Sequence, residues 1–136
     1  MKIEANNQIA TILIANYNNS KYIDQCLESA INQNYKKIEI IVVDDNSSDN
    51  SLEVLNKYTS KIKLIKKKHK TGLGFFDQMS SYYEAFKESK GEIIFFLDSD
   101  DYFHLDKISI VMNEFLQNQK TNILFDLPVK KYINKE

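Results

Sequence analysis

Arginine is absent from this sequence, and all 18 of its basic residues are lysine. Without a guanidinium group, no side chain can bind a diphosphate through the two parallel hydrogen bonds that arginine makes. A diphosphate ligand would therefore have to be held by lysine, by a metal ion or by backbone N–H groups. The formal net charge of −1 gives no general attraction to nucleic acid or to an anionic membrane. We expect no nucleic-acid partner.

Cysteine is equally scarce, with Cys26 as its single occurrence. An internal disulfide is therefore excluded, which favours a reducing compartment. Cys26 falls within a helical apolar pattern, and we expect it in the core. Residues 1–8 lack the apolar stretch of a signal peptide, and no segment approaches the roughly 18 apolar residues of a membrane span. We expect a cytoplasmic protein without a transmembrane segment.

The chain has 136 residues, 43% of them apolar and 27% charged, which suits one compact domain. Short apolar runs predict strands at residues 9–15, 38–43, 62–65 and 93–97, of which the first two are expected to be buried. Apolar residues at spacings of three and four come after each run and predict a helix after each strand. The tail, 122–136, is expected to add at most one more strand.

The helices carry further local signals. Ser20 is expected to cap the first helix, and Gly91 to stop the third. Large apolar residues at helical spacing are expected to pack the third helix into the core rather than to stack on a base: Phe75, Met79, Tyr82, Tyr83 and Phe86.

Alternating strands and helices predict a Rossmann-like α/β fold, with a mostly parallel sheet covered by helices on both faces. Ligands bind such sheets at the carboxyl ends of the strands. Polar clusters follow three of the predicted strands, at residues 16–19, 44–49 and 98–101. Their convergence at one edge of the sheet predicts a ligand site there.

The cluster Asp98-Ser99-Asp100 follows the most strongly apolar run. Side chains at i and i+2 of an extended chain point the same way, so the two carboxylates are expected to lie together. Like charges this close raise one another's pKa unless a cation neutralises them, and carboxylate oxygens suit Mg²⁺ or Mn²⁺. The alternative is an acidic turn that only caps the next helix.

Further candidates lie at the other strand ends and in a basic run. Asp44 and Asp45 either cap a helix or accept hydrogen bonds from N–H or hydroxyl groups of a ligand. Tyr17 follows the first strand, where its ring could stack on a nucleobase. The lysine run 66–70 is either a solvated face or a phosphate contact, for which Lys70, beside the glycines, is the candidate.

Four segments in this order resemble the N-terminal part of family 2 glycosyltransferases: residues 11–20, 29–35, 40–49 and 91–101. The resemblance runs from Ile9 to about Phe115. It implies a GT-A fold and an inverting transferase that uses a UDP-sugar or other NDP-sugar. It also implies a glycan or lipid-linked acceptor in bacterial surface polysaccharide or lipooligosaccharide synthesis. The full-length enzyme would then work in the cytoplasm, with peripheral association at the inner face of the membrane.

Carried over by position, the resemblance puts Tyr17 on the base, with one or both of Asp44 and Asp45 at its edge. It puts Asp98 near the ribose and diphosphate, and Asp100 on a metal. The candidate metal ligands are thus Asp100 and Asp98, holding Mn²⁺ or Mg²⁺. Our candidate nucleotide-sugar-binding residues are Ala15, Tyr17, Asp44, Asp45, Lys70, Asp98 and Ser99.

The sequence departs from the family pattern in three places. Ala15-Asn16 replaces the usual Pro-Thr, and Asp77-Gln78 stands where Arg-Asn is common. The family's general base lies well beyond the D-x-D motif, so we expect it beyond Glu136 and assign no catalytic residue here. We therefore expect residues 1–136 to be a single nucleotide-sugar-binding domain, a fragment that lacks the acceptor-binding half.

Three other functions compete with this interpretation. A non-catalytic nucleotide-sugar-binding module shares every motif. A receiver-type phosphoacceptor domain also uses strand-end aspartates, but its acidic pair follows the first strand, whereas Asp44-Asp45 follows the second. A dinucleotide-binding oxidoreductase is disfavoured, because Gly72-Leu73-Gly74 does not follow the first strand and no G-x-G-x-x-G is present.

Overall fold

The structure is a computed structural model that describes residues 8–68 and 71–125. Strands and helices alternate along these residues: β1 (Ala10–Asn16), α1 (Ile23–Ile31), β2 (Ile38–Asp44), α2 (Ser51–Asn56), β3 (Lys63–Lys66), α3 (Gly74–Lys87), β4 (Ile93–Asp98) and α4 (Lys107–Gln117). The strands pair in the order β3-β2-β1-β4, and every pair is parallel. Because all three connections between strands are crossovers through a helix, the carboxyl ends of the strands lie at one edge of the sheet. The predicted α/β class is confirmed.

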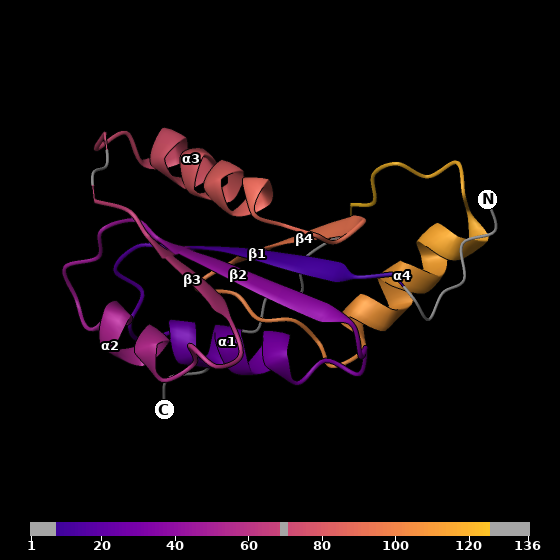
Figure 1. Ribbon diagram of the computed structural model, residues 1–136, viewed down its shortest axis with the longest axis horizontal. Coiled ribbons are helices and arrows are strands. Elements are labelled where there is room, and N and C mark those ends of the chain that lie inside the picture. The colour runs from indigo at the N-terminus through magenta and orange to yellow at the C-terminus, as the bar shows by residue number, and fades with distance from the viewer. Residues whose placement is uncertain (1–7, 69–70, 126–136) are drawn as a thin grey trace, which may run out of the picture.

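Helices cover both faces of the sheet, with α3 on one face and α1 and α2 on the other (Figure 1). The alternation of β1 divides its side chains between the two layers. Ile12 and Ile14 join the larger core with α1 and α4, whereas Leu13 packs on the α3 side against Tyr82 and Ala85. The central strand is therefore buried on both faces, as its apolar sequence predicts.

The start of α1 differs from the prediction. Tyr22 precedes the helix and makes no side-chain capping bond, so the prediction that Ser20 is the N-cap is wrong. Ser20 instead donates its backbone N–H to Asp49 Oδ2 over 2.9 Å. This hydrogen bond links the loop after β1 to the loop after β2. Helix α1 begins three residues later, at Ile23. Cys26 is fully buried, as predicted.

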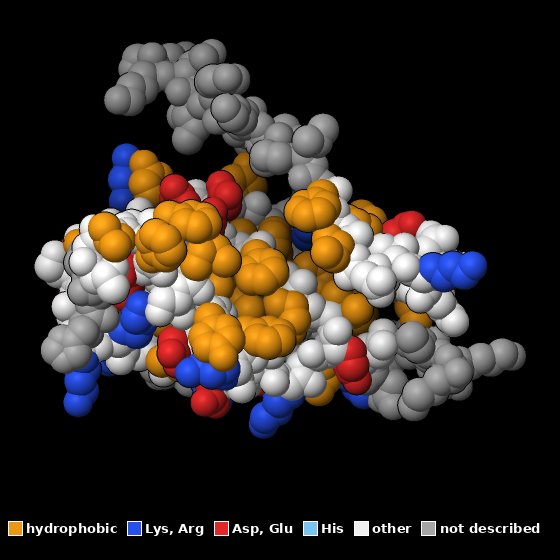
Figure 2. All heavy atoms as spheres, turned by 90° about the horizontal axis from the view of Figure 1, so that it is seen from above, with side chains coloured by type: hydrophobic (Ala, Val, Ile, Leu, Met, Phe, Trp, Pro, Cys, Tyr) orange, Lys and Arg blue, Asp and Glu red, His pale blue; other side chains and the backbone are white. Residues whose placement is uncertain are grey.

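The core-facing side of α3 also differs from the prediction. Its buried residues are Asp77, Ser81, Tyr82 and Ala85. Of the predicted apolar stripe only Tyr82 is buried, and the others are exposed: Phe75, Met79, Tyr83 and Phe86. Figure 2 looks down on this side of the molecule and shows hydrophobic side chains gathered there. Small Ser81 and Ala85 allow the helix to lie close to the sheet, and the large side chains are left on its outer surface.

Gly91 does not stop α3, which ends at Lys87 with Glu88 as its C-cap. A side chain at Gly91 is excluded by β1. A Cβ atom there would press on the Thr11 hydroxyl and lie 2.6 Å from the carbonyl oxygen of Ile9. The glycine is therefore needed for the close approach of the β4 entry to β1.

The remaining expectations concern the tail and membrane spans. Residues 121–125 form no strand, and residues 126–136 lie outside the described part of the chain. Among the described helices, none is long and apolar enough to cross a membrane.

Candidate functional site

A cleft of about 420 Å³ opens where the carboxyl ends of β1, β2 and β4 meet the start of α3. The predicted site residues that line it are Ala15, Tyr17, Asp45, Asp98, Ser99 and Asp100. Asn16, Asn19, Asp77 and Gln78 line it too, although we did not select them from the sequence. Asp44 does not reach the cleft, and Lys70 lies outside the described residues. The predicted convergence of three strand ends is therefore present.

The two members of the acidic pair at the end of β2 face different surroundings. Asp44 is 1% exposed and accepts hydrogen bonds from Asn16 Nδ2 at 2.8 Å and from the Ser47 hydroxyl at 2.7 Å. Its other oxygen accepts the Ser47 backbone N–H at 3.0 Å. Asp44 thus shapes the loop after β2, and Asp45 is the member of the pair that lines the cleft.

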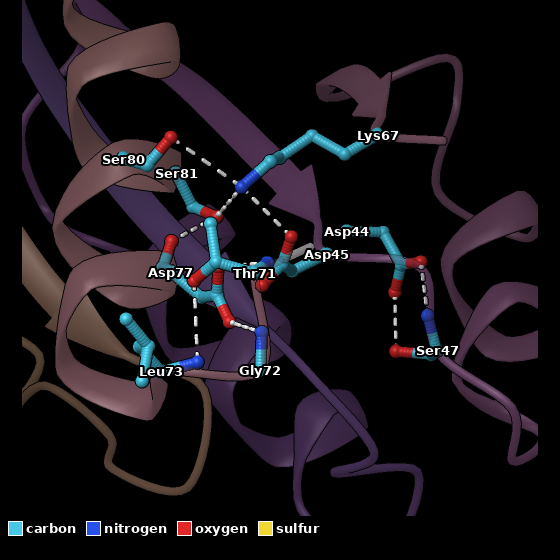
Figure 3. Close-up of polar contacts among 10 residues, drawn as sticks. All are labelled: Asp44, Asp45, Ser47, Lys67, Thr71, Gly72, Leu73, Asp77, Ser80 and Ser81. Carbon is cyan, nitrogen blue, oxygen red and sulfur yellow. Dashed lines mark hydrogen bonds and ion pairs between the residues drawn. The ribbon is translucent and has the colours of Figure 1, made fainter. Parts of the chain in front are cut away.

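Lys67, just after β3, forms an ion pair with Asp45. Its Nζ lies 2.8 Å from Asp45 Oδ1, and both side chains are largely buried. Figure 3 shows the same ammonium group pointing also toward Ser80 and Ser81 of α3. Oδ1 of Asp45 is buried without an aligned hydrogen bond, so the lysine charge compensates it. The ion pair therefore fixes the Asp45 side chain beside the cleft.

The glycine-containing loop before α3 is fixed by Asp77. One Asp77 oxygen accepts the Thr71 backbone N–H at 2.7 Å and the Thr71 hydroxyl at 2.8 Å, and the other accepts the Gly72 N–H at 2.8 Å (Figure 3). The hydrogen bond from the Thr71 backbone N–H is the main reason that the pKa of Asp77 lies below its usual value. Gly72 has φ of +79°, a conformation that favours glycine. Asp77 thereby defines one wall of the cleft.

The loop after β1 connects the other walls. Asn18 has φ of +50°, and its side-chain oxygen accepts the Ser48 backbone N–H at 2.8 Å. Asn19 Nδ2 donates to the Ser99 hydroxyl at 2.6 Å, which links the ends of β1 and β4. Asn16 Oδ1 is a buried acceptor with no hydrogen-bond partner in the described structure. The loop after β1 is therefore hydrogen-bonded to the loops after β2 and β4.

The acidic loop is a turn rather than an extended segment. β4 ends at Asp98, and the Asp101 backbone N–H donates to the Asp98 carbonyl at 3.0 Å. The i, i+2 alternation used in the prediction therefore does not extend to Asp100, although Asp98 and Asp100 both line the cleft. Burial, and then the charges of Asp100 and Asp98, raise the pKa of Asp101. The expected crowding of negative charge is present in this turn.

Asp98 is held on two sides. Gln78 Nε2 donates to its Oδ1 at 2.8 Å, and the Tyr82 hydroxyl donates to the same oxygen. Cys26 lies behind, with its Sγ 3.6 Å from the Asp98 carbonyl oxygen. Burial, and then the charges of nearby aspartates led by Asp101, raise the pKa of the Cys26 thiol to about 12. The cysteine is therefore a neutral packing residue beneath the acidic loop.

Two chemically different ends result from this arrangement. Asp45, paired with Lys67, follows β2, and the acidic turn follows β4 on the other side of β1. Tyr17, which follows β1, lines the same cleft. No three His, Cys, Asp or Glu side chains of residues 8–68 and 71–125 are grouped to hold a metal by themselves. The cleft thus suits an elongated ligand that brings ligand atoms of its own to the acidic end.

Sequence comparison places residues 11–136 in the family described as Glycosyl transferase family 2. A similar protein is the UDP-Glc:alpha-D-GlcNAc-diphosphoundecaprenol beta-1,3-glucosyltransferase WfaP of Escherichia coli, 39% identical over 83% of this chain and 43% of its own length. Another is the poly(ribitol-phosphate) beta-N-acetylglucosaminyltransferase TarS of Staphylococcus aureus, 33% identical over 72% of this chain and 17% of its own. The chain therefore spans less than half the length of these relatives.

Solved structures have the same fold. Residues 1–349 of S. aureus TarS in complex with UDP-GlcNAc superpose with a TM-score of 0.72 and 26% identity, over 82% of this chain and 32% of that one. The mannosyltransferase PcManGT of Pyrobaculum calidifontis, with GDP-Man and Mn²⁺, has a TM-score of 0.66 at 21% identity and supports the fold alone. The predicted GT-A fold is confirmed. The chain belongs to glycosyltransferase family 2.

Proposed function

We propose that this chain is the donor-binding half of an inverting glycosyltransferase that takes a UDP-sugar. The observation that carries the proposal is one cleft that Tyr17, Asp45 and the Asp98 to Asp100 turn all line. Asp45 follows β2 and the turn follows β4, on opposite sides of the central strand β1. A nucleoside diphosphate has matching ends, an aromatic base and an anionic diphosphate. The UDP-GlcNAc complex of the similar TarS structure supports UDP as the nucleotide.

The nucleobase end favours uracil over cytosine. Asp45 lines the cleft as a carboxylate paired with Lys67, and carboxylate oxygens accept hydrogen bonds. Uracil presents an N3–H donor on its pairing edge, whereas N3 of cytosine is an acceptor and would repel the carboxylate. Tyr17 lines the same cleft and is 43% exposed, so its ring is accessible to a base face.

The acidic end fits a divalent cation together with a diphosphate. Mg²⁺ and Mn²⁺ are commonly bound by one or two carboxylates plus phosphate oxygens, and Asp98 and Asp100 supply two carboxylates at the cleft. Asp98, Asp100 and Asp101 lie within four residues of one turn, and a cation would offset their negative charge. When bound, the metal would offset the charge that develops on the leaving diphosphate.

In the reaction, the chain's own residues bind and orient the donor. Asp45 and Tyr17 fix the base, and Asp77 holds the glycine-containing loop that walls the cleft. An acceptor hydroxyl attacks the anomeric carbon, the bond to the diphosphate breaks, and the hydroxyl proton passes to a general base. That base is expected outside these 136 residues, in an acceptor-binding half for a glycan or lipid-linked acceptor. A lipid-linked acceptor would bring the enzyme to the inner face of the cell membrane.

Calorimetric titration of the chain with UDP, CDP and GDP, each with and without MnCl₂, tests the proposal. We expect UDP to bind in the presence of Mn²⁺ and CDP to bind at least about tenfold more weakly. The Asp100→Asn variant should lose most of the Mn²⁺ enhancement and keep its thermal stability. A folded chain that binds none of the nucleotides would contradict the proposal.

A second candidate is a nucleotide-sugar-binding module that performs no transfer. Such a module would have the same cleft and the same strand-end residues. Both candidates predict UDP binding, so the measurement that separates them is release of UDP from a UDP-sugar when glycan acceptors are added. Acceptor-dependent release would exclude the non-catalytic module.

A further inference from the structure

Two donors from one helix converge on a single carboxylate oxygen in the cleft. Gln78 Nε2 lies 2.8 Å from Asp98 Oδ1, and the Tyr82 hydroxyl donates to the same atom. Gln78 and Tyr82 are four residues apart, so they lie on one face of α3 over successive turns. In the described structure neither donates to Oδ2. The two oxygens of Asp98 therefore have different surroundings.

The tyrosine is itself fixed by packing. Its ring is 7% exposed and lies against Leu13, Ile41, Val43 and Ala85 in the smaller core. It also contacts the Phe96 ring edge to face, with centroids 5.1 Å apart and planes at 86°. Its hydroxyl thus projects from a rigid ring toward the end of β4, and it has little freedom to follow Asp98 if the carboxylate rotates.

The glutamine is fixed by its place in the helix. Gln78 follows Asp77 in the first turns of α3, and Asp77 ties that end to Thr71 and Gly72 by three hydrogen bonds of 2.7 to 2.8 Å. The Asp77 backbone carbonyl also accepts the Ser81 hydroxyl at 2.9 Å. The start of α3 is therefore anchored, and with it the base of the Gln78 side chain.

We propose that Gln78 and Tyr82 are positioning residues, which hold Oδ1 of Asp98 so that Oδ2 is the oxygen presented to the metal and diphosphate of the donor. This inference rests on the proposed function, which supplies the ligand. A carboxylate with one oxygen engaged by two donors offers the other as a single, directed ligand atom. Glutamine is neutral, so Gln78 orients the carboxylate without neutralising it.

The surroundings of Asp100 differ from those of Asp98. It is exposed in the turn after β4, whereas Asp98 is half-buried at the strand end and held by α3. One carboxylate is therefore pre-oriented and the other is free to adjust when the ligand arrives. Holding Asp98 in advance removes part of the ordering cost of binding.

Two variants that preserve volume test the inference in the intact chain: Gln78→Met and Tyr82→Phe, made singly and together. Tyr83→Phe is the matched control, because Tyr83 is 61% exposed on the adjacent position of the same helix and does not contact Asp98. Thermal unfolding verifies that each variant folds. Crystal structures then give the conformation of Asp98, and titration with UDP, with and without Mn²⁺, gives the affinity.

We expect the double variant to lose the single Asp98 conformation and to bind UDP with Mn²⁺ about tenfold more weakly. UDP affinity without metal and the melting temperature should change little, and Tyr83→Phe should match the wild type. An unchanged Asp98 conformation in the double variant would overturn the inference, as would equal losses of affinity with and without metal. If the wild-type chain binds no nucleotide, the proposed function fails, and the crystal structures alone then decide whether α3 positions Asp98.

Discussion

Lys67 Nζ lies 2.8 Å from Asp45 Oδ1, and the side chains are only 15% and 6% exposed. The ion pair joins the end of β3 to the end of β2 beneath the cleft. Replacing Lys67 with Met would leave a buried carboxylate without its counter-charge. We expect a loss of about 2 kcal/mol of unfolding free energy, below the cost of breaking a fully buried pair because Lys67 keeps some access to water. Urea denaturation at pH 7 measures it.

The double variant Lys67→Met/Asp45→Asn is the control for this loss. It removes both charges, so it should recover a large part of the stability that the single variant loses. Equal stabilities of the single and double variants would show that Lys67 stabilises the fold by packing rather than by pairing with Asp45.

Gly91→Ala tests the contact between the entry to β4 and β1. The new Cβ would lie 2.6 Å from the carbonyl oxygen of Ile9 and 2.8 Å from the Thr11 nitrogen, and backbone atoms cannot move aside cheaply. We expect about 3 kcal/mol of destabilisation, measured by chemical denaturation. Gly74→Ala is the control, because a Cβ there meets nothing within 4 Å. Similar losses in both variants would remove the steric explanation.

The Cys26 thiol should be unreactive in the native chain. It is fully buried, and burial together with the neighbouring aspartates raises its pKa to about 12, so almost no thiolate exists at pH 8. A thiol reagent such as DTNB should label it at least about a hundredfold more slowly in buffer than in 6 M guanidinium chloride. Rapid native labelling would mean that α1 opens readily from the acidic loop.

Asp49 is expected to make the free energy of unfolding depend on pH in the acid range. Burial alone would raise its pKa, but hydrogen bonds from Ser51 and Ser20 outweigh burial and lower the pKa from 3.8 to about 2. A carboxyl whose pKa is lowered by folding stabilises the native state above its unfolded pKa, and that contribution is lost as pH falls through about 2.

Asp49→Asn should therefore cost about 1 kcal/mol at pH 6, a modest value because the residue is partly exposed and screened by solvent. The difference between variant and wild type should shrink between pH 4 and pH 2. Urea denaturation across this range measures it. A difference independent of pH would show that the charge of Asp49 contributes nothing.

The sequence predicts the strands well because each is a short apolar run between polar clusters. β2, for example, begins at Ile38 as predicted and extends only to Asp44, one residue beyond the run. The buried face of α3 could not be predicted in the same way, because small and polar residues such as Ser81 form it and the large apolar ones do not. Hydrophobic periodicity locates a helix, but it does not tell which face meets the sheet.

Some residues of the candidate site were predictable from the sequence, and others were not. Tyr17, Asp45 and Asp98 follow strands, and the rule for parallel sheets places strand ends together. Gln78 and Tyr82 lie inside a helix, and only the tertiary packing of α3 brings them to Asp98. In the sequence, Gln78 was marked only by the departure at Asp77-Gln78, and Tyr82 only by its place in the apolar stripe of the helix. Asp44 and Asp45 are equivalent as a motif, and only the structure separates the loop-forming acid from the one at the cleft.

The hydrogen bond from Asn19 to Ser99 joins residues 80 positions apart. During synthesis, β1, β2 and β3 leave the ribosome first, yet the opposite wall of the cleft exists only after Asp100 has emerged and β4 has paired with β1. An N-terminal piece that ends before Asp98 would lack the acidic wall of the cleft. A nucleotide that binds only the complete cleft would therefore stabilise the chain in which β4 has paired with β1. It would shift the folding equilibrium of the chain toward that state.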